Sequence, residues 1–165
     1  GQFVVQDPTA MRAAQAVPCE LGDTVVDLWA APGTKTTWLA EAVGPDGRVF
    51  AYDIDENRRG RITENAQRLG LTKIICLAAS ISDLPRADCV LADVPCSNSG
   101  VLGRRVEARR RLEAATFEGL PKLQSELLDQ AISLTKPGGH AVYSTCSIDA
   151  EENEGVVAAA QARQR

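Results

Sequence analysis

Short apolar runs, rich in β-branched residues, alternate along the chain with longer segments in which apolar residues recur at helical spacing. The apolar runs predict strands at 24–28, 48–52, 73–77, 89–92 and 140–143. The helical segments predict helices at 56–69, 120–134 and 150–164, besides one that ends at residue 43. Strands that alternate with helices favour a mainly parallel sheet with helices on both faces. Because crossovers between parallel strands are right-handed, the carboxyl ends of the strands then meet at one edge of the sheet.

Glycine and proline mark the ends of several of these elements. The sequence Gly-Pro-Asp-Gly at 44–47 predicts a turn. Gly70 suits the left-handed position that closes the helix before it. The sequence Lys-Pro-Gly-Gly at 136–139 is expected to end the preceding helix and to precede the last strand.

Two cysteines follow directly after predicted strands. Cys96 lies four residues beyond the run that ends at Ala92, and Cys146 lies three residues beyond the run that ends at Tyr143. Ligands of open α/β sheets bind at the carboxyl ends of the strands. Two thiols at the carboxyl ends of strands, with Asp93 three residues before Cys96, indicate covalent chemistry. The alternative is that both cysteines are small apolar side chains of the core.

The composition is that of one globular domain, which we expect to occupy residues 1–165. Hydrophobic residues make up 44% of the chain and charged residues 24%. No apolar stretch approaches the roughly 20 residues that a membrane helix needs. The five cysteines show no CxxC spacing, so the sequence predicts neither a disulfide framework nor a metal site, and a reducing cytoplasm is the expected setting.

The net charge of −4 hides a local cluster of basic residues. Five arginines fall within eight residues: Arg104, Arg105, Arg109, Arg110 and Arg111. A partner senses charge only within about a Debye length, roughly 8–10 Å, so a local patch can act on an acidic body. The alternative is a solvated helix face, in which Glu107 and Arg111 form an i,i+4 pair.

A loop of small residues and a later acid suggest a nucleoside-bearing ligand. The first strand runs through Asp27 into Trp-Ala-Ala-Pro-Gly-Thr-Lys at 29–35, where small residues let the backbone approach a ligand closely. Asp53 follows the second strand, where a carboxylate can accept hydrogen bonds from ribose hydroxyls. Neither a GxGxxG fingerprint nor a Walker loop is present. The alternative is a tight turn followed by a surface acid.

Taken together, these motifs resemble one enzyme family. The segments AAPGTKT, DID, DVPCSNSGVLGRR, LPKLQSELLDQA and YSTCSIDAEENE follow one another in the order found in RNA cytosine-5 methyltransferases of the Sun/NOP2/NSUN group. The resemblance covers most of residues 4–158. It implies the catalytic domain of a Rossmann-like, class I S-adenosylmethionine-dependent methyltransferase. We expect this chain to lack the C-terminal antiparallel strands of such enzymes and their upstream RNA-binding region.

The resemblance also assigns roles to the motif residues. It implies that Cys146 is the nucleophile that adds to carbon 6 of cytosine, that Asp93 acts near ring nitrogen 3, and that Cys96 assists removal of the hydrogen on carbon 5. The implied cofactor-binding residues are Ala30, Ala31, Pro32, Gly33, Thr34, Lys35, Asp53, Ser80 and Asp93. The implied RNA-binding residues are Arg104, Arg105, Arg109 and Arg110.

The chemistry explains why thiols suit this reaction. Carbon 5 of cytosine is a poor nucleophile, and a thiolate that adds to carbon 6 loads electron density onto it. An ordinary thiol has a pKa of about 8.5. We therefore expect cationic groups, Lys35 or the arginines, to lower the pKa of Cys146. We also expect the two sulfur atoms to flank one pyrimidine ring.

The sequence departs from the family pattern in the cofactor loop and after the third strand. Trp29 stands where the family often has cysteine. Thr34 stands where the family has glycine, so its backbone must keep a negative φ to avoid strain. The acid expected near adenine after the third strand is absent, and Ser80 or Asp83 is the nearest substitute.

The implied function is methylation of RNA, with ribosomal RNA as the first expectation and transfer RNA as the second. One alternative is a module that binds cofactor or RNA without turnover, and another is a methyltransferase that acts on a substrate other than RNA. His140, the single histidine, is given no catalytic role. Without the closing strands the sheet would expose an edge, which favours pairing between copies.

Overall fold

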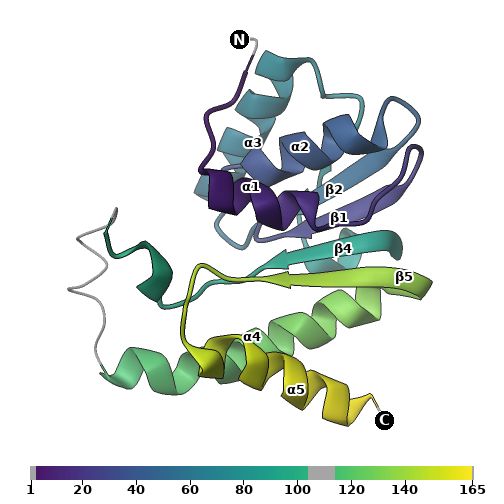
Figure 1. Cartoon of the computed structure of the whole chain (residues 1–165). Coiled ribbons are helices and arrows are strands. Elements are labelled where there is room, and N and C mark those ends of the chain that lie inside the picture. The colour runs from purple at the N-terminus through teal and green to yellow at the C-terminus, as the bar shows by residue number, and fades with distance from the viewer. Residues whose placement is uncertain (1–2, 104–113, 165) are drawn as a thin grey trace.

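A parallel sheet of five strands forms the centre of the structure, a computed structural model that describes residues 3–103 and 114–164 (Figure 1). The strands are β1 (Thr24–Leu28), β2 (Arg48–Tyr52), β3 (Ile75–Leu77), β4 (Ala87–Asp93) and β5 (Thr135–Ser144). Their order across the sheet is β3-β2-β1-β4-β5, and every neighbouring pair is parallel. The chain therefore reverses its direction of winding between β1 and β4, where ligands of open α/β sheets bind.

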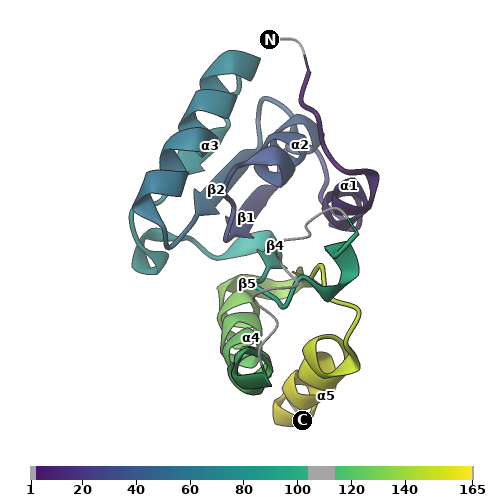
Figure 2. The ribbon, with the colours of Figure 1, turned by 90° about the vertical axis from the view of Figure 1, so that its left-hand side faces the viewer.

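Helices cover both faces of this sheet. They are α1 (Pro8–Gln15), α2 (Thr34–Val43), α3 (Glu56–Leu69), α4 (Ala114–Leu134) and α5 (Glu154–Arg163). Figures 1 and 2 show α1, α2 and α3 on one side, and α4 with α5 on the other. The predicted Rossmann-like architecture is confirmed. None of these described helices is long and apolar enough to cross a membrane.

The two apolar layers come from alternate residues of the central strands. Val25 of β1 belongs to the core beneath α2 and α3, together with Leu39 and Ile62. Val26, its neighbour, belongs to the core beneath α4, together with Leu127. Burial on both faces explains why these strands read as continuous apolar runs rather than as alternating ones.

Several predicted boundaries are confirmed. The strands at 24–28 and 48–52 and the helix at 56–69 have the predicted limits. Gly70 ends α3 with φ 73°, in the left-handed region. The third strand begins at Ile75, two residues later than predicted, while β4 extends beyond the predicted run at both ends.

Three predictions are corrected. The helix α1 was not predicted, although Asp7 caps it and Pro8 occupies its first turn, which is a common start signal. The helix predicted at 150–164 is interrupted, because a 3-10 turn at Ala150–Glu152 precedes α5 and Asn153 between them adopts φ −115° and ψ −93°.

The third correction concerns residues 136–139, which lie inside β5 instead of before it. The register passes from Ala87 opposite Thr135 to Cys89 opposite His140, so the turn residues form an irregularity within the strand. An ion pair lies at this irregularity, where Lys136 Nζ is 2.8 and 2.9 Å from the two carboxylate oxygens of Asp88. Within the described residues β5 pairs only with β4, which leaves it at one edge of the sheet.

Replacement of Leu39 by alanine tests the packing of α2 on the sheet. Leu39 is fully buried, so the variant should lose about 2–5 kcal/mol of unfolding free energy, measured by urea denaturation with circular dichroism. Leu21→Ala is the matched control, because Leu21 is 80% exposed. Equal stability of the two variants would contradict the described core.

Candidate active site

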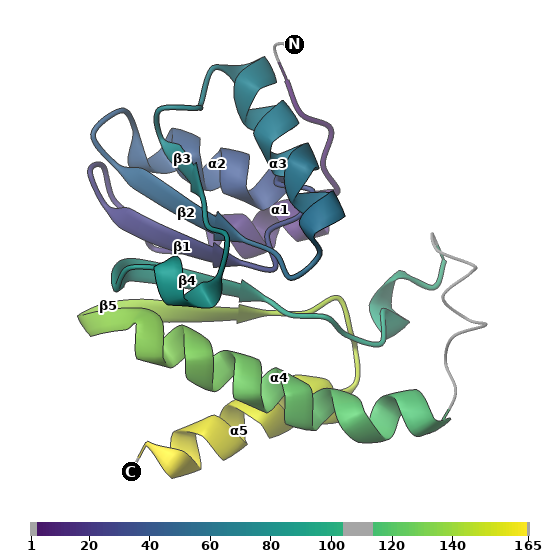
Figure 3. The ribbon, with the colours of Figure 1, turned by 180° about the vertical axis from the view of Figure 1, so that it is seen from behind.

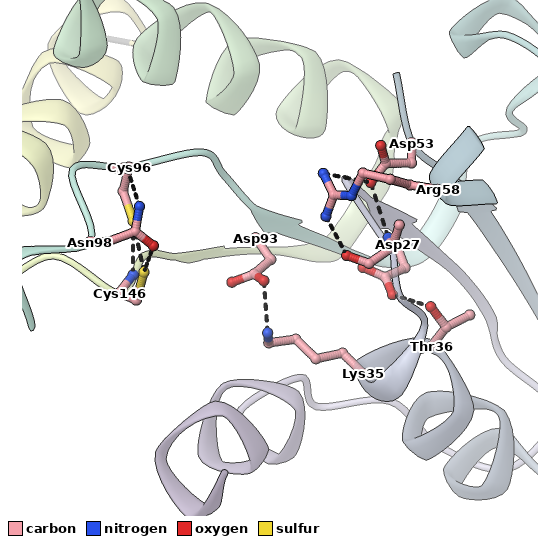
Figure 4. Close-up of polar contacts among 10 residues, drawn as sticks. Asp27, Lys35, Thr36, Asp53, Arg58, Asp93, Cys96, Asn98 and Cys146 are labelled. Carbon is pink, nitrogen blue, oxygen red and sulfur yellow. Dashed lines mark hydrogen bonds and ion pairs between the residues drawn. The ribbon is translucent and has the colours of Figure 1, made fainter. Parts of the chain in front are cut away.

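The segments that leave β4 and β5 bring Cys96 and Cys146 into contact. Their Sγ atoms lie 3.0 Å apart, and the backbone N–H of Cys146 donates to Cys96 Sγ at 3.3 Å. The thiol of Cys146 also lies 3.1 Å from Asn98 Oδ1 (Figure 4). Figure 3 shows both strands ending on the same side, with these segments beyond them. Cys146 is exposed and Cys96 half-buried, so neither belongs to the apolar core.

The separation of the sulfur atoms corrects one expectation. A stacked base occupies about 3.4 Å, so atoms on opposite faces of a ring stand roughly twice that distance apart. The 3.0 Å between the two sulfurs leaves no room for a ring between them. The expected arrangement, with one sulfur on each side of a pyrimidine ring, is therefore not present in this structure.

The contact also changes the acidity of the pair. The hydrogen bond from Cys146 lowers the pKa of Cys96 to about 7, against the opposing effects of burial and of the Glu152 carboxylate. A pKa of about 7 allows the Cys96 thiol to lose its proton near neutral pH. The expected lowering of the Cys146 pKa by cations stays a prediction, since Lys35 is paired with an aspartate and the arginines at 104–111 lie outside the described residues.

An ion pair lies between the sulfurs and the first strands. Lys35 Nζ, from the first turn of α2, contacts Asp93 Oδ2, at the end of β4, at 2.7 Å. The two side chains are 15% and 30% exposed, so the pair is only partly open to solvent. In Figure 4 it stands between the cysteine pair and the carboxylates of Asp27 and Asp53.

The loop at 29–35 is held by Asp53. This carboxylate is fully buried, and its Oδ2 accepts the N–H of Ala31 at 3.0 Å. Arg58 was not predicted as part of the site, yet its Nη2 donates to the carbonyl of Ala31 at 2.8 Å and its Nη1 lies 3.8 Å from Asp53. Its position in the first turn of α3 gives no signal in the sequence.

Two residues of the loop at 29–35 adopt a left-handed backbone conformation. Gly33 has φ 96° and precedes α2, and Trp29 has φ 59°. Thr34 is not among the described residues with positive φ, so the expectation of a negative φ is confirmed. The strain that a side chain brings to left-handed backbone therefore falls on Trp29.

Asp27 is a further acid at the head of the loop. It is fully buried, and its Oδ2 accepts the hydroxyl of Thr36 at 2.6 Å. Its Oδ1 has no hydrogen-bond partner in the described part of the chain. Burial raises the pKa of Asp27 to about 7, although the bond from Thr36 opposes this. The sequence marked Asp27 only as a strand end.

Ser80 and Asp83, which were predicted as substitutes for the acid near adenine, bond to their own neighbours in the chain. Asp83 Oδ2 accepts the N–H of Ser80 at 2.9 Å, and Ser80 Oγ accepts the N–H of Ser82 at 3.2 Å. Together they cap the 3-10 turn at Ile81–Asp83. A contact of Ser80 with a cofactor stays a prediction.

Glu152 lies beneath the cysteine pair and was not predicted. It is 1% exposed, and it accepts the N–H of Ser97 at 2.9 Å, the hydroxyl of Ser147 at 2.9 Å and Gln124 Nε2 at 2.7 Å. Burial alone would raise the pKa of Glu152, but these hydrogen bonds hold it below its usual value. Nothing in the sequence distinguishes this buried carboxylate from the exposed Glu151 beside it.

Comparison with known proteins places the chain in a family. The profile described as 16S rRNA methyltransferase RsmB/F matches residues 14–165. Ribosomal RNA small subunit methyltransferase B of Salmonella arizonae is 37% identical over 162 residues, which are 95% of this chain and 38% of the relative. The enzyme of the same name from Vibrio cholerae is 39% identical over 158 residues, 93% of this chain and 36% of the relative. The chain thus spans less than two fifths of these relatives.

Solved structures agree with this assignment. NSun6 from Pyrococcus horikoshii with SFG is 33% identical, with a TM-score of 0.87, over 98% of this chain and 42% of that protein. A methyltransferase homologue from the same organism is 34% identical, with a TM-score of 0.81, over 96% of this chain and 51% of that protein. The chain therefore belongs to the family of 16S rRNA methyltransferases RsmB/F.

Proposed function

We propose that the chain is the catalytic part of an S-adenosylmethionine-dependent RNA cytosine-5 methyltransferase and that ribosomal RNA is its substrate. The observation that carries the proposal is the 3.0 Å contact between Cys96 and Cys146 at the ends of neighbouring strands. A nucleophile and a base within hydrogen-bond reach form the arrangement that covalent catalysis requires. The names of the relatives support ribosomal RNA as the substrate class.

The crevice suits S-adenosylmethionine, which when bound supplies an activated methyl group. Its ammonium and ribose hydroxyls are hydrogen-bond donors, and the carboxylates of Asp27, Asp53 and Asp93 stand at the ends of three neighbouring strands. The buried Oδ1 of Asp27, to which no described residue bonds, is an acceptor that such a donor would satisfy. The structure of NSun6 with SFG, an analogue of this cofactor, further supports the assignment.

Cys96 activates Cys146 in the first step. The Cys146 thiol passes its proton along the 3.0 Å contact to the Cys96 thiolate, and its sulfur forms a bond to carbon 6 of cytosine. The electron pair of the 5,6 double bond moves into the ring toward nitrogen 3. The proton that nitrogen 3 gains comes from the Lys35 ammonium by way of the Asp93 carboxylate, paired with it at 2.7 Å, which leaves Lys35 as a neutral amine.

Release of the product requires a base on the same side of the ring. After carbon 5 has gained its methyl group from the opposite face, its hydrogen points toward the two sulfurs. Cys96, which has meanwhile lost to water the proton that it took from Cys146, takes this hydrogen as a proton. The 5,6 double bond re-forms, nitrogen 3 returns its proton to Lys35 by way of Asp93, and the bond between carbon 6 and Cys146 breaks with Cys146 leaving as a thiolate. A pKa of about 7 suits a base that must lose and regain a proton near neutral pH.

The arginines at 104, 105, 109 and 110 complete the proposal as phosphate contacts. Such contacts position a nucleic acid without reading its sequence. A paired cytosine must also turn out of its stack to reach the sulfurs, at a cost of a few kcal/mol.

Replacement of each cysteine tests the covalent mechanism. Incubated with small-subunit ribosomal RNA and S-adenosylmethionine, Cys96→Ala should accumulate an RNA adduct, because release has lost its base even though addition is slower. Cys146→Ala should form none, because it lacks the nucleophile. Denaturing gel electrophoresis with labelled RNA measures the adduct, and label from the methyl donor follows turnover.

Two results would contradict this mechanism. An adduct in Cys146→Ala would assign the nucleophile to another residue. RNA binding by Cys96→Ala with no adduct, and no methyl transfer by the unaltered chain, would favour a binding module without turnover.

The acidity of Cys96 gives a pH prediction. Because the hydrogen bond from Cys146 lowers its pKa to about 7, alkylation of Cys96 by iodoacetamide should rise as pH passes upward through 7 and level off above 8. In Cys146→Ala the rise should move toward pH 8.5, so alkylation at pH 7 should slow roughly tenfold. Peptide mass spectrometry measures the rates, and an unchanged profile in the variant would refute the thiol contact as the cause.

A further inference from the structure

We propose that Glu152 is the positioning residue that holds Cys96 and Cys146 in contact, a role that deepens the function proposed above. Both cysteines lie in irregular segments outside the strands. Direct bonds between these segments include Gly100 N–H to Cys146 O at 3.0 Å and Ile148 N–H to Ser99 Oγ at 3.0 Å. Besides these direct bonds, the buried carboxylate of Glu152 bonds to both segments.

Glu152 bonds to the residue that follows each cysteine. Ser97 donates its backbone N–H to Oε2, and Ser147 donates its hydroxyl to Oε1, each at 2.9 Å. Gln124 of α4 donates to the same Oε2 at 2.7 Å and to the carbonyl of Pro95 at 3.0 Å. The backbone on both sides of Cys96 is therefore tied to this carboxylate and its amide partner.

The backbone of Glu152 is itself fixed to the sheet. The hydroxyl of Tyr143, on β5, donates to the carbonyl of Glu152 at 2.6 Å. The position of the carboxylate is thus set by the strand that also leads to Cys146. A rigid anchor of this kind is what a precisely spaced pair of catalytic groups needs.

The neighbouring acid Asp149 does not replace Glu152. Its Oδ2 accepts the hydroxyls of Ser99 at 2.6 Å, Ser147 at 3.0 Å and Ser97 at 3.2 Å. All three are side-chain contacts, and one of them uses the Ser147 hydroxyl that also lies 2.9 Å from Glu152 Oε1. Glu152 instead accepts a backbone N–H next to Cys96, which fixes the course of the chain.

Glu152 affects Cys96 in two ways that have opposite signs. Its negative charge disfavours the Cys96 thiolate, whereas the closeness of Cys146, which Glu152 maintains, favours that thiolate. If position is its main role, loss of the carboxylate separates the sulfurs and raises the pKa of Cys96. If charge is its only role, the same change lowers that pKa. Titration of the thiol therefore separates the two roles.

The experiment is the pH profile of Cys96 alkylation by iodoacetamide in Glu152→Gln and Glu152→Asp. We expect alkylation at pH 7 to slow roughly fivefold in both, as the pKa rises by about one unit from about 7. The glutamine cannot accept as a carboxylate does, and the aspartate keeps the charge but is too short to reach both segments. Faster or unchanged alkylation in Glu152→Asp overturns the proposal, and this variant decides the matter if Glu152→Gln does not fold.

Two controls accompany these variants. Glu151→Gln removes the same charge from an exposed neighbour and should leave the profile unchanged. Gly100→Ala should slow alkylation as the Glu152 variants do, because its Cβ would lie 2.8 Å from the carbonyl of Cys146 and push the segments apart. Gly103→Ala is the matched control, because among the described residues beyond its chain neighbours no atom lies within 4 Å of the added Cβ.

The titration needs neither RNA nor cofactor, so it does not depend on turnover. A chain that forms no RNA adduct but shows the expected titrations would refute the proposed function and leave the positioning role intact. A chain that forms the adduct but shows no effect at Glu152 would refute the positioning role alone.

Discussion

The parallel pairing of β4 with β5 is the constraint on which the candidate site depends. Asp93 lies opposite Ser144 at the end of both strands, and Val94 N–H extends the ladder by one bond to Ser144 O at 3.0 Å. Cys96 and Cys146 follow within a few residues, so little chain is left in which the sulfurs can diverge. Since one strand residue spans about 3.3 Å, a slip of one residue would move them apart by more than their present separation.

Apart from α1, the elements that local sequence determines were predicted well, and those that tertiary contacts determine were not. β1, β2 and α3 are bounded by clear changes from apolar to polar or glycine residues, and their limits agree with the prediction. The irregularity at 136–139 lies in the pairing of β5 with β4, where Lys136 contacts Asp88, 48 residues away in sequence. No local pattern of prolines and glycines shows whether such a turn ends a strand or lies within it.

The same distinction holds for the site. Acids and cysteines at strand ends could be predicted to converge, because parallel topology brings strand ends together. Three features depend on which side chains pack around them: the burial of Glu152, the bond from Arg58 to the loop at 29–35, and the oxygen of Asp27 to which no described residue bonds. The expectation that two sulfurs flank a ring was wrong because sequence spacing gives no distance across the two segments.

The closeness of the two thiols also makes the site sensitive to oxidation. Two sulfurs in contact can together give up two electrons and two protons to a peroxide, which is reduced to water, and become joined by a covalent bond. That single event would consume the nucleophile and the base at once. Any activity of the chain is therefore tied to the reducing power of its surroundings, and a thiol reductant would restore it.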